Sequence, residues 1–315
     1  MQGPIVRKIL FVRSSGGIVG GKRTEWETKM RTVKLHSRLA VTTLVSTLVA
    51  ATLVAATMSG LATPASAAVP GLTIVSVTST TDSDDHKSAR ASCPGNTVAI
   101  GSGATIEGGL GEVNIESVVP SSDSVSALAY EDANGTNNSW SVTAQAICAD
   151  PPPGHVIVYA TSIQDSLNKD VTAFCPGNTV TIGSGALLFG SFGDVELEEV
   201  RPQLTSVTAS AKEIGNGIGT PWGVVAYASC ADPLAGLVTV STSSANTAVN
   251  KSVVAVCPPG TSVLNAAGRL NNGDGRVLFD DLFAGTTSVT ATGKETGNGT
   301  GTPWRVQAIA LCATP

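Results

Sequence analysis

The residues best placed to do chemistry are a glutamate and an asparagine that recur with one spacing. They occur three times, as Glu131 and Asn134, Glu213 and Asn216, and Glu295 and Asn298, with a glycine after each asparagine and a tryptophan downstream. A carboxylate, an amide and an aromatic ring could bind a glycan, and the oxygens could bind Ca²⁺. The same residues suit a hairpin loop in which Asn-Gly adopts positive φ and the glutamate accepts hydrogen bonds from loop amides. We favour the hairpin, and ligand binding by these residues remains the alternative.

Catalytic arrangements are not evident elsewhere. His86 and His155 are the histidines beyond residue 67, both lie outside the repeated pattern, and we expect both to be solvated. No Ser/His/Asp arrangement, zinc-protease motif, phosphate loop or nucleotide fingerprint occurs. One carboxylate per loop does not supply the acid/base pair of a glycosidase. We therefore expect no catalytic residue, metal or cofactor.

Two acidic clusters are expected to be surface features. Asp194, Glu196 and Glu198 alternate with apolar residues, which predicts one exposed face of a strand and protection of a sheet edge. The run from Asp82 to Asp85 resembles the start of a calcium-binding loop but lacks the distal glutamate. Neither cluster is predicted to bind a cation.

An internal repeat positions these residues. Shifting the sequence by 82 residues superimposes it on itself without a gap from residue 68 onward. In the first unit, strand-like segments are expected at 72–79, 88–93, 97–106, 112–119, 124–131 and 139–148. Every second residue of the last segment is kept in all three units, which predicts a strand with one buried face. The tryptophans at its start, Trp140, Trp222 and Trp304, are expected to supply most of the core.

Six cysteines allow 15 pairings, and the repeat selects one of them. It predicts the structural disulfides Cys93–Cys148, Cys175–Cys230 and Cys257–Cys312. By the chain-entropy model each closed loop is worth about 4 kcal/mol. No CxxC or histidine spacing accompanies the thiols, so a zinc site is not expected.

The sequence thus predicts an all-β protein of three tandem antiparallel β-sandwich-like units, at 68–152, 153–235 and 236–315. Two arrangements fit these units. One is three independent sandwiches in a row, and the other is a single pseudo-threefold β-prism with one unit per face. A disulfide within each unit and proline-containing linkers favour independent units.

The N-terminal part predicts export. Residues 30–67 have the cationic start, the long uncharged segment and the Ala65-Ser66-Ala67 cleavage site of a signal peptide. Residues 1–29 are interpreted as a dispensable extension or a misassigned start, with translation beginning at Met30. If the segment were not cleaved, it would anchor the protein in a membrane.

The composition limits the partners. Residues 68–315 carry 10 basic and 22 acidic residues, a formal charge of −12. Such a surface repels phosphate backbones and anionic headgroups, so nucleic acid is not an expected partner. Together with the disulfides, the signal peptide predicts a secreted, extracellular protein.

Two motifs carry a resemblance to a known type of protein. Cys93-Pro94-Gly95-Asn96-Thr97-Val98-Ala99-Ile100-Gly101-Ser102-Gly103 and Trp140-x-Val142-x-Ala144-x-Ala146-x-Cys148-Ala149 resemble a repeat module of exported bacterial, often actinobacterial, proteins. The resemblance implies export and β structure but no activity. The third unit has Asn265-Ala266-Ala267-Gly268 in place of Gly-Ser-Gly-Ala, so its local turn is expected to differ. The repeat number also gives a weaker likeness to the threefold β-prism of an egg-membrane outer-layer protein.

We expect a non-enzymatic secreted or cell-surface protein with a binding or structural role. Three copies of a loop could give multivalent binding of a cell-wall or extracellular polysaccharide. The alternatives are a secreted hydrolase with an unrecognised carboxylate site and a secreted inhibitor-like protein. A site used once should break the symmetry of the repeat, and no asymmetric cluster near a plausible cleft is evident in the sequence.

Overall fold

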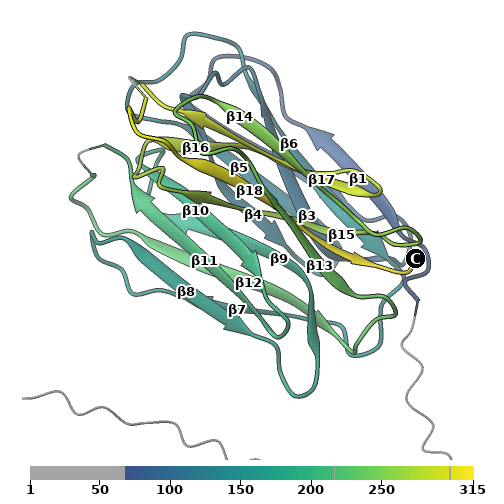
Figure 1. Cartoon of the computed structure of the whole chain (residues 1–315). Helices are drawn as coiled ribbons and strands as arrows, with labels where there is room; N and C mark the ends of the chain where they lie inside the picture. The colour runs from purple at the N-terminus through teal and green to yellow at the C-terminus, as the bar shows by residue number, and fades with distance from the viewer. Residues whose placement is uncertain (1–67, 216, 298) are drawn as a thin grey trace, which may run out of the picture. The chain divides into compact units, whose positions relative to one another are not determined.

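The computed structural model describes residues 68–215, 217–297 and 299–315. These residues form eighteen strands and no helix (Figure 1), which confirms the all-β prediction. The predicted extension at 1–29 and the predicted signal peptide at 30–67 lie outside the described residues. Within the described part, no helix is long and apolar enough to cross a bilayer.

Each unit contributes six strands. Unit 1 contains β1 (Thr73–Thr78), β2 (His86–Ser92), β3 (Val98–Glu107), β4 (Val113–Pro120), β5 (Ser124–Glu131) and β6 (Ser141–Ala149). Unit 2 contains β7 (Val156–Thr161), β8 (Lys169–Phe174), β9 (Val180–Phe189), β10 (Val195–Pro202), β11 (Ser206–Glu213) and β12 (Gly223–Ala231). Unit 3 contains β13 (Val238–Ser243), β14 (Lys251–Val256), β15 (Ser262–Asn271), β16 (Val277–Ala284), β17 (Ser288–Glu295) and β18 (Arg305–Ala313). The segments expected in unit 1 match its strands to within two residues.

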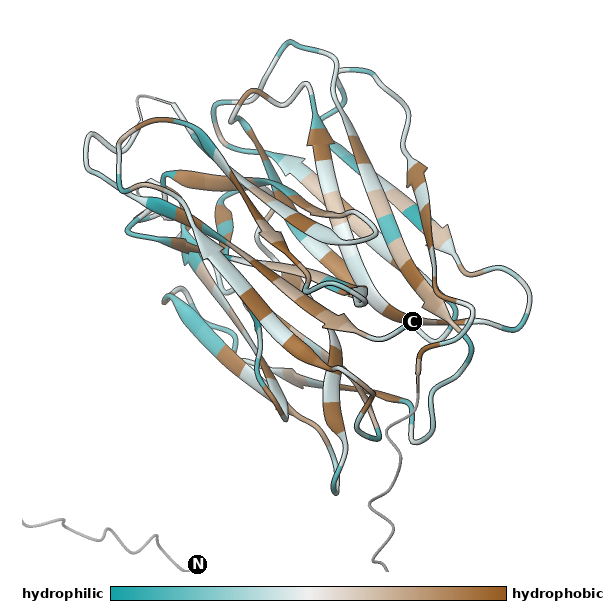
Figure 2. Ribbon diagram, turned by 45° about the vertical axis from the view of Figure 1, so that its right-hand side comes forward, coloured by the Kyte–Doolittle hydropathy of each residue, from teal (hydrophilic) through white to brown (hydrophobic). Residues whose placement is uncertain are grey.

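Each unit is a sandwich of two three-stranded layers. In unit 1 the layers are β1-β6-β3 and β2-β5-β4, and units 2 and 3 repeat this arrangement. Apolar and polar bands alternate along many strands (Figure 2), as expected where one face of each layer is buried. The disulfide of unit 1 joins the layers, because Cys93 follows β2 and Cys148 lies in β6. All three predicted disulfides are confirmed.

The units are not independent, because each sheet takes three strands from one unit and three from another. The strand orders are β1-β6-β3-β16-β17-β14, β2-β5-β4-β9-β12-β7 and β13-β18-β15-β10-β11-β8. Units 1 and 2 join through β4 and β9, units 2 and 3 through β10 and β15, and units 3 and 1 through β16 and β3. The favoured arrangement of independent sandwiches is therefore wrong. The chain forms one closed pseudo-threefold ring, in which each unit spans two sheets rather than one face.

The departure from the repeat in unit 3 lies where the three units meet. Gly101, Gly183 and Asn265 are equivalent positions, and each follows a bulge residue in its strand. A Cβ on Gly101 would lie 1.7 Å from the carbonyl oxygen of Leu264, so no side chain fits there. In unit 3 the Asn265 side chain is buried, and its Oδ1 accepts hydrogen bonds from the backbone N–H groups of Ser102 (2.9 Å) and Ser184 (3.0 Å). Asn265 lies within strand β15 and connects the three units by these hydrogen bonds. The substitution does not change a local turn, contrary to the expectation.

Candidate functional site

The repeated glutamate and tryptophan contact each other in every unit. The indole Nε1–H of Trp140, Trp222 and Trp304 donates to Oε1 of Glu131, Glu213 and Glu295 at 2.9, 3.0 and 2.7 Å, respectively. The tryptophans are fully buried, as expected for core residues. A buried ring offers no surface to a ligand, so these tryptophans cannot serve as a platform for sugar stacking.

A lysine completes this contact in every unit, and the sequence interpretation missed it. The Nζ atoms of Lys87, Lys169 and Lys251 lie 4.4, 3.7 and 3.4 Å from the ring centroids of the three tryptophans. At these distances an ammonium group is attracted to the face of the indole. The three lysines coincide under the 82-residue shift, and this recurrence in the sequence could have identified them as part of the repeated contact. Lysine, tryptophan and glutamate together close one end of each sandwich.

The loops after the glutamates have the expected hairpin chemistry. Gly135, Gly217 and Gly299 have φ of 63°, 78° and 75°. The backbone N–H of Thr136 donates to Glu131 at 3.0 Å. Burial raises the pKa of Glu295, but hydrogen bonds from Thr300 and Trp304 outweigh it and hold this pKa below its usual value. These contacts support the structural interpretation of the glutamates.

The asparagines of the repeated motif are less fully described. The side-chain amide of Asn134 lies 3.4 Å from Oε2 of Glu112, whose Oε1 accepts a hydrogen bond from Gly297 N–H of unit 3 at 3.1 Å. Asn216 and Asn298 lie outside the described residues. Ligand binding by the asparagines remains a prediction.

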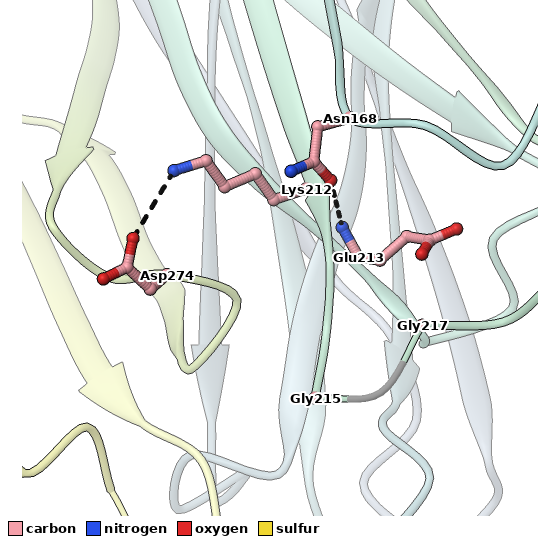
Figure 3. A pocket seen from close by; sticks show the side chains of 6 residues that line it. All are labelled: Asn168, Lys212, Glu213, Gly215, Gly217 and Asp274. Carbon is pink, nitrogen blue, oxygen red and sulfur yellow. Dashed lines mark hydrogen bonds and ion pairs between the residues drawn. The ribbon is translucent and has the colours of Figure 1, made fainter.

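Two equivalent clefts lie at the junctions between units, on the side where the hairpin loops meet. The cleft between units 2 and 3, of about 380 Å³, is lined by Asn168, Lys212, Glu213, Gly215, Gly217 and Asp274 (Figure 3). The cleft between units 3 and 1, of about 610 Å³, is lined by Leu110, Glu112, Ala248, Val249, Asn250, Glu295, Gly297 and Gly299. Asparagine, glutamate and two glycines recur in both at the 82-residue spacing. The closed ring therefore builds one type of cleft twice.

Hydrogen bonds and charge hold the cleft residues in place. The backbone N–H of Glu213 donates to Asn168 Oδ1 at 3.1 Å, and that of Glu295 donates to Asn250 Oδ1 at 2.7 Å. Lys212 Nζ lies 2.7 Å from Glu198 and reaches towards Asp274 of the next unit at 3.9 Å (Figure 3). Each asparagine is thus fixed by its oxygen, which orients its NH₂ group. Both clefts present polar side chains in an open setting, and the cleft between units 2 and 3 also carries charges of both signs.

The prediction of an exposed acidic face at residues 194–198 is wrong. Strand β10 is not an edge strand, because it lies between β11 and β15. Glu196 is fully buried and accepts hydrogen bonds from the backbone N–H groups of Gly275 (3.1 Å) and Val277 (3.3 Å). Burial raises its pKa to about 8. Residues of unit 3 cover strand β10. The alternation of acidic and apolar residues within unit 2 could not predict that another unit would bury this face.

A second set of inward carboxylates recurs in all units and was also missed. Glu116, Glu198 and Asp280 are equivalent, and each is the bulge residue of its strand. Lysine pairs with two of them, Lys212 with Glu198 at 2.7 Å and Lys294 with Asp280 at 2.8 Å. Unit 1 has Tyr130 at the position that Lys212 and Lys294 occupy in units 2 and 3. Glu116 is buried there, and burial raises its pKa to about 7.

The remaining polar residues divide between structure and surface. His86 is exposed, as expected, but His155 is half-buried, and its Nε2 lies 3.0 Å from Ser229 Oγ. Burial lowers the pKa of His155, which corrects the expectation of a solvated side chain. Asp82 pairs with Lys87, and this hydrogen bond lowers the pKa of Asp82 to about 2. Among the residues that the structure describes, no group of three His, Cys, Asp or Glu side chains is arranged to hold a metal ion.

Comparison with models of known protein families gives no match for this chain, and comparison with curated proteins gives none either. The resemblance to a repeat module of exported bacterial proteins therefore remains a prediction. Three disulfides in an all-β fold are compatible with an extracellular protein.

Proposed function

We propose that the chain is an exported, non-enzymatic protein that binds saccharide chains in the clefts between its units. The observation that carries this proposal is the recurrence of one open, polar cleft at two junctions of the ring. Hydroxyl-rich ligands are bound by such fixed donors and acceptors. Two equivalent clefts on one molecule would also raise the avidity for a repeating polymer.

The geometry favours binding over hydrolysis. A glycosidase needs one carboxyl of raised pKa to donate a proton and a second, ionised one. In the cleft between units 3 and 1, the pKa of Glu295 is lowered, and its Oε1 accepts the indole N–H of Trp304 at 2.7 Å. The second acidic residue is Asp274 in one cleft and Glu112 in the other, and these positions are not equivalent, because Asp274 corresponds to Leu110 and Glu112 to Arg276. A catalytic pair common to both clefts is therefore not supported.

The proposal is tested by retention of the oxidised protein on peptidoglycan, chitin and cellulose. The informative variant carries Asn168→Asp and Asn250→Asp. An aspartate keeps the oxygen that accepts the N–H of Glu213 or Glu295, but replaces the NH₂ group with a second oxygen. We expect the fold to survive and retention to fall.

A matched control carries Asn96→Asp and Asn178→Asp. These exposed asparagines lie beside Cys93 and Cys175, away from the clefts, and the control makes the same change of charge. We expect it to be retained like the native protein. Equal retention of both variants would show that the clefts are not the site, and no retention of the native protein on any support would overturn saccharide binding.

A further inference from the structure

The third junction of the ring has the same backbone plan as the two clefts but different side chains. Between units 1 and 2, the positions of Asn168, Lys212 and Asp274 are held by His86, Tyr130 and Phe192, respectively. Polar and charged groups are thus replaced by three aromatic rings. They come from β2 and β5 of unit 1 and from the β9–β10 turn of unit 2, so only the assembled ring brings them together.

The three rings form one exposed cluster. The ring of His86 stacks on that of Tyr130 with centroids 5.1 Å apart and an interplanar angle of 18°. Tyr130 meets Phe192 edge to face, at 6.3 Å and 85°. The Phe192 residue is 71% exposed, and the side chain of His86 is 57% exposed. Much of the surface of Phe192 and the face of His86 turned away from Tyr130 are therefore available to a ligand.

The cluster is unfavourable to the fold at one point. The left-handed φ of Phe192, 45°, is not that point, because the equivalent Leu110 and Asp274 have φ of 54° and 51° and the conformation belongs to the shared turn. Tyr130 stands where the other units have a lysine that pairs with the inward carboxylate, so Glu116 is buried with no lysine at this position. Unfavourable burial of this kind persists where it serves a ligand site.

The charges around the cluster narrow the class of ligand. Asp85 Oδ1 lies 2.7 Å from His86 Nδ1, and Asp194 lies two residues beyond Phe192. These carboxylates repel acidic groups, and an aromatic face attracts a cation. Uronic and sialic acids are disfavoured, whereas neutral sugars are accepted and amino sugars gain most.

We infer that His86, Tyr130 and Phe192 form a stacking subsite for one face of a sugar ring that carries no acidic group, with amino sugars preferred. This inference rests on the proposed saccharide binding and deepens it. It places the strongest contact with the saccharide at the junction of units 1 and 2. The class of sugar follows from the negative charges around that junction. Stacking of this kind adds to the hydrogen bonds that the polar clefts supply.

The test uses calorimetric titration of the oxidised full chain with three oligosaccharides of one length. These are a glucosamine oligomer, an N-acetylglucosamine oligomer and a galacturonate oligomer. The expected order of affinity is amino, then neutral, then acidic. Phe192→Gly and Tyr130→Lys should each weaken binding of the first two by about tenfold, the factor for loss of one aromatic contact of about 1.4 kcal/mol.

At pH 8, where the titration is done, both variants are also expected to fold at least as well as the native protein, which separates loss of a contact from loss of structure. Glycine relieves the left-handed strain at 192, and lysine copies the residue at 212 and 294. A third variant, Phe192→Asp, copies Asp274, whose φ of 51° is similar, and it should also weaken binding.

The outcomes distinguish this inference from the proposed function. If the oligomers bind and the aromatic variants bind equally well, the stacking subsite is refuted and the polar clefts are still supported. Preference for the galacturonate oligomer would also refute the subsite. If none of the three oligomers binds, both proposals fail.

Discussion

Replacing Tyr130 by lysine should stabilise the protein in a way that depends on pH. Equivalent lysines pair with Glu198 at 2.7 Å and with Asp280 at 2.8 Å, whereas Glu116 faces Tyr130. Burial raises the pKa of Glu116 from 4.5 to about 7, against a hydrogen bond from Gly193 N–H. A raised pKa in the folded state means that stability is fully present below pH 4.5 and is lost as the pH rises through 7.

The size of the effect follows from these values. The difference between 4.5 and 7 corresponds to about 3 kcal/mol lost on ionisation of Glu116. A lysine recovers only part of this loss, because burial still raises the pKa of Asp280 to about 6 beside Lys294. We therefore expect Tyr130→Lys to raise the free energy of unfolding by about 1 to 2 kcal/mol at pH 8. At pH 4 Glu116 is protonated, and loss of the aromatic contacts of Tyr130 should cost about 0.5 to 1 kcal/mol.

Urea denaturation at pH 4, 6 and 8 measures this change, because urea adds no salt that would screen the ion pair. Tyr130→Gln removes the ring without adding a charge, and its effect should be the same at all three pH values. The reverse change, Lys212→Tyr, should destabilise the protein more at pH 8 than at pH 4. Equal effects of Tyr130→Lys at pH 4 and pH 8 would refute the reasoning.

Three further predictions concern the fold. Burial raises the pKa of Glu196 to about 8, so its ionisation lowers the free energy of unfolding by at most about 5 kcal/mol as the pH rises. Glu196→Gln removes this ionisation and should flatten the decline of stability that urea denaturation shows between pH 5 and pH 8. An unchanged slope would contradict the burial argument. Replacing Cys175 and Cys230 together by alanine opens a 55-residue loop and should lower the free energy of unfolding by about 4 kcal/mol, whereas no loss would contradict the chain-entropy estimate. Asn265→Gly, which copies units 1 and 2, leaves the backbone N–H groups of Ser102 and Ser184 without their acceptor and should cost about 2 to 4 kcal/mol by urea denaturation; a neutral effect would show that water or backbone replaces it.

The sequence predicted what repeats within one unit. Alternation along 139–148 predicted a strand with one buried face. Strand β6 lies there with Val142, Ala144 and Ala146 fully buried, but Gln145 and Ile147 of the opposite face are buried too, and Gln145 bonds Ala284 of unit 3. Retention of both cysteines in every unit selected the disulfides, because each unit has two. These features depend on local pattern and on composition, both of which a single chain displays.

The joining of the units could not be predicted in the same way. The pairing of β4 with β9 rests on two residue pairs, Ser117 with Leu187 and Val118 with Ala186, and nothing in their types demands a partner. The acidic alternation at Glu196 is that of an exposed face until unit 3 covers it. The glycines that allow close approach, Gly101 and Gly183, looked like turn residues. Such contacts between units leave no periodic signal within either unit.

The symmetry of the repeat also separates structural residues from functional ones. Residues that every unit needs, such as the lysine, tryptophan and glutamate at the end of each sandwich, recur three times at fixed spacing. A site used once has to appear where the repeat is broken, and no broken cluster was evident in the sequence because its members lie in different units. In the ring, Tyr130 of unit 1 meets Phe192 of unit 2, and both replace charged residues of unit 2 or unit 3. The break therefore lies at a junction, and a ring of three similar units can carry one distinct subsite without losing the contacts that close it.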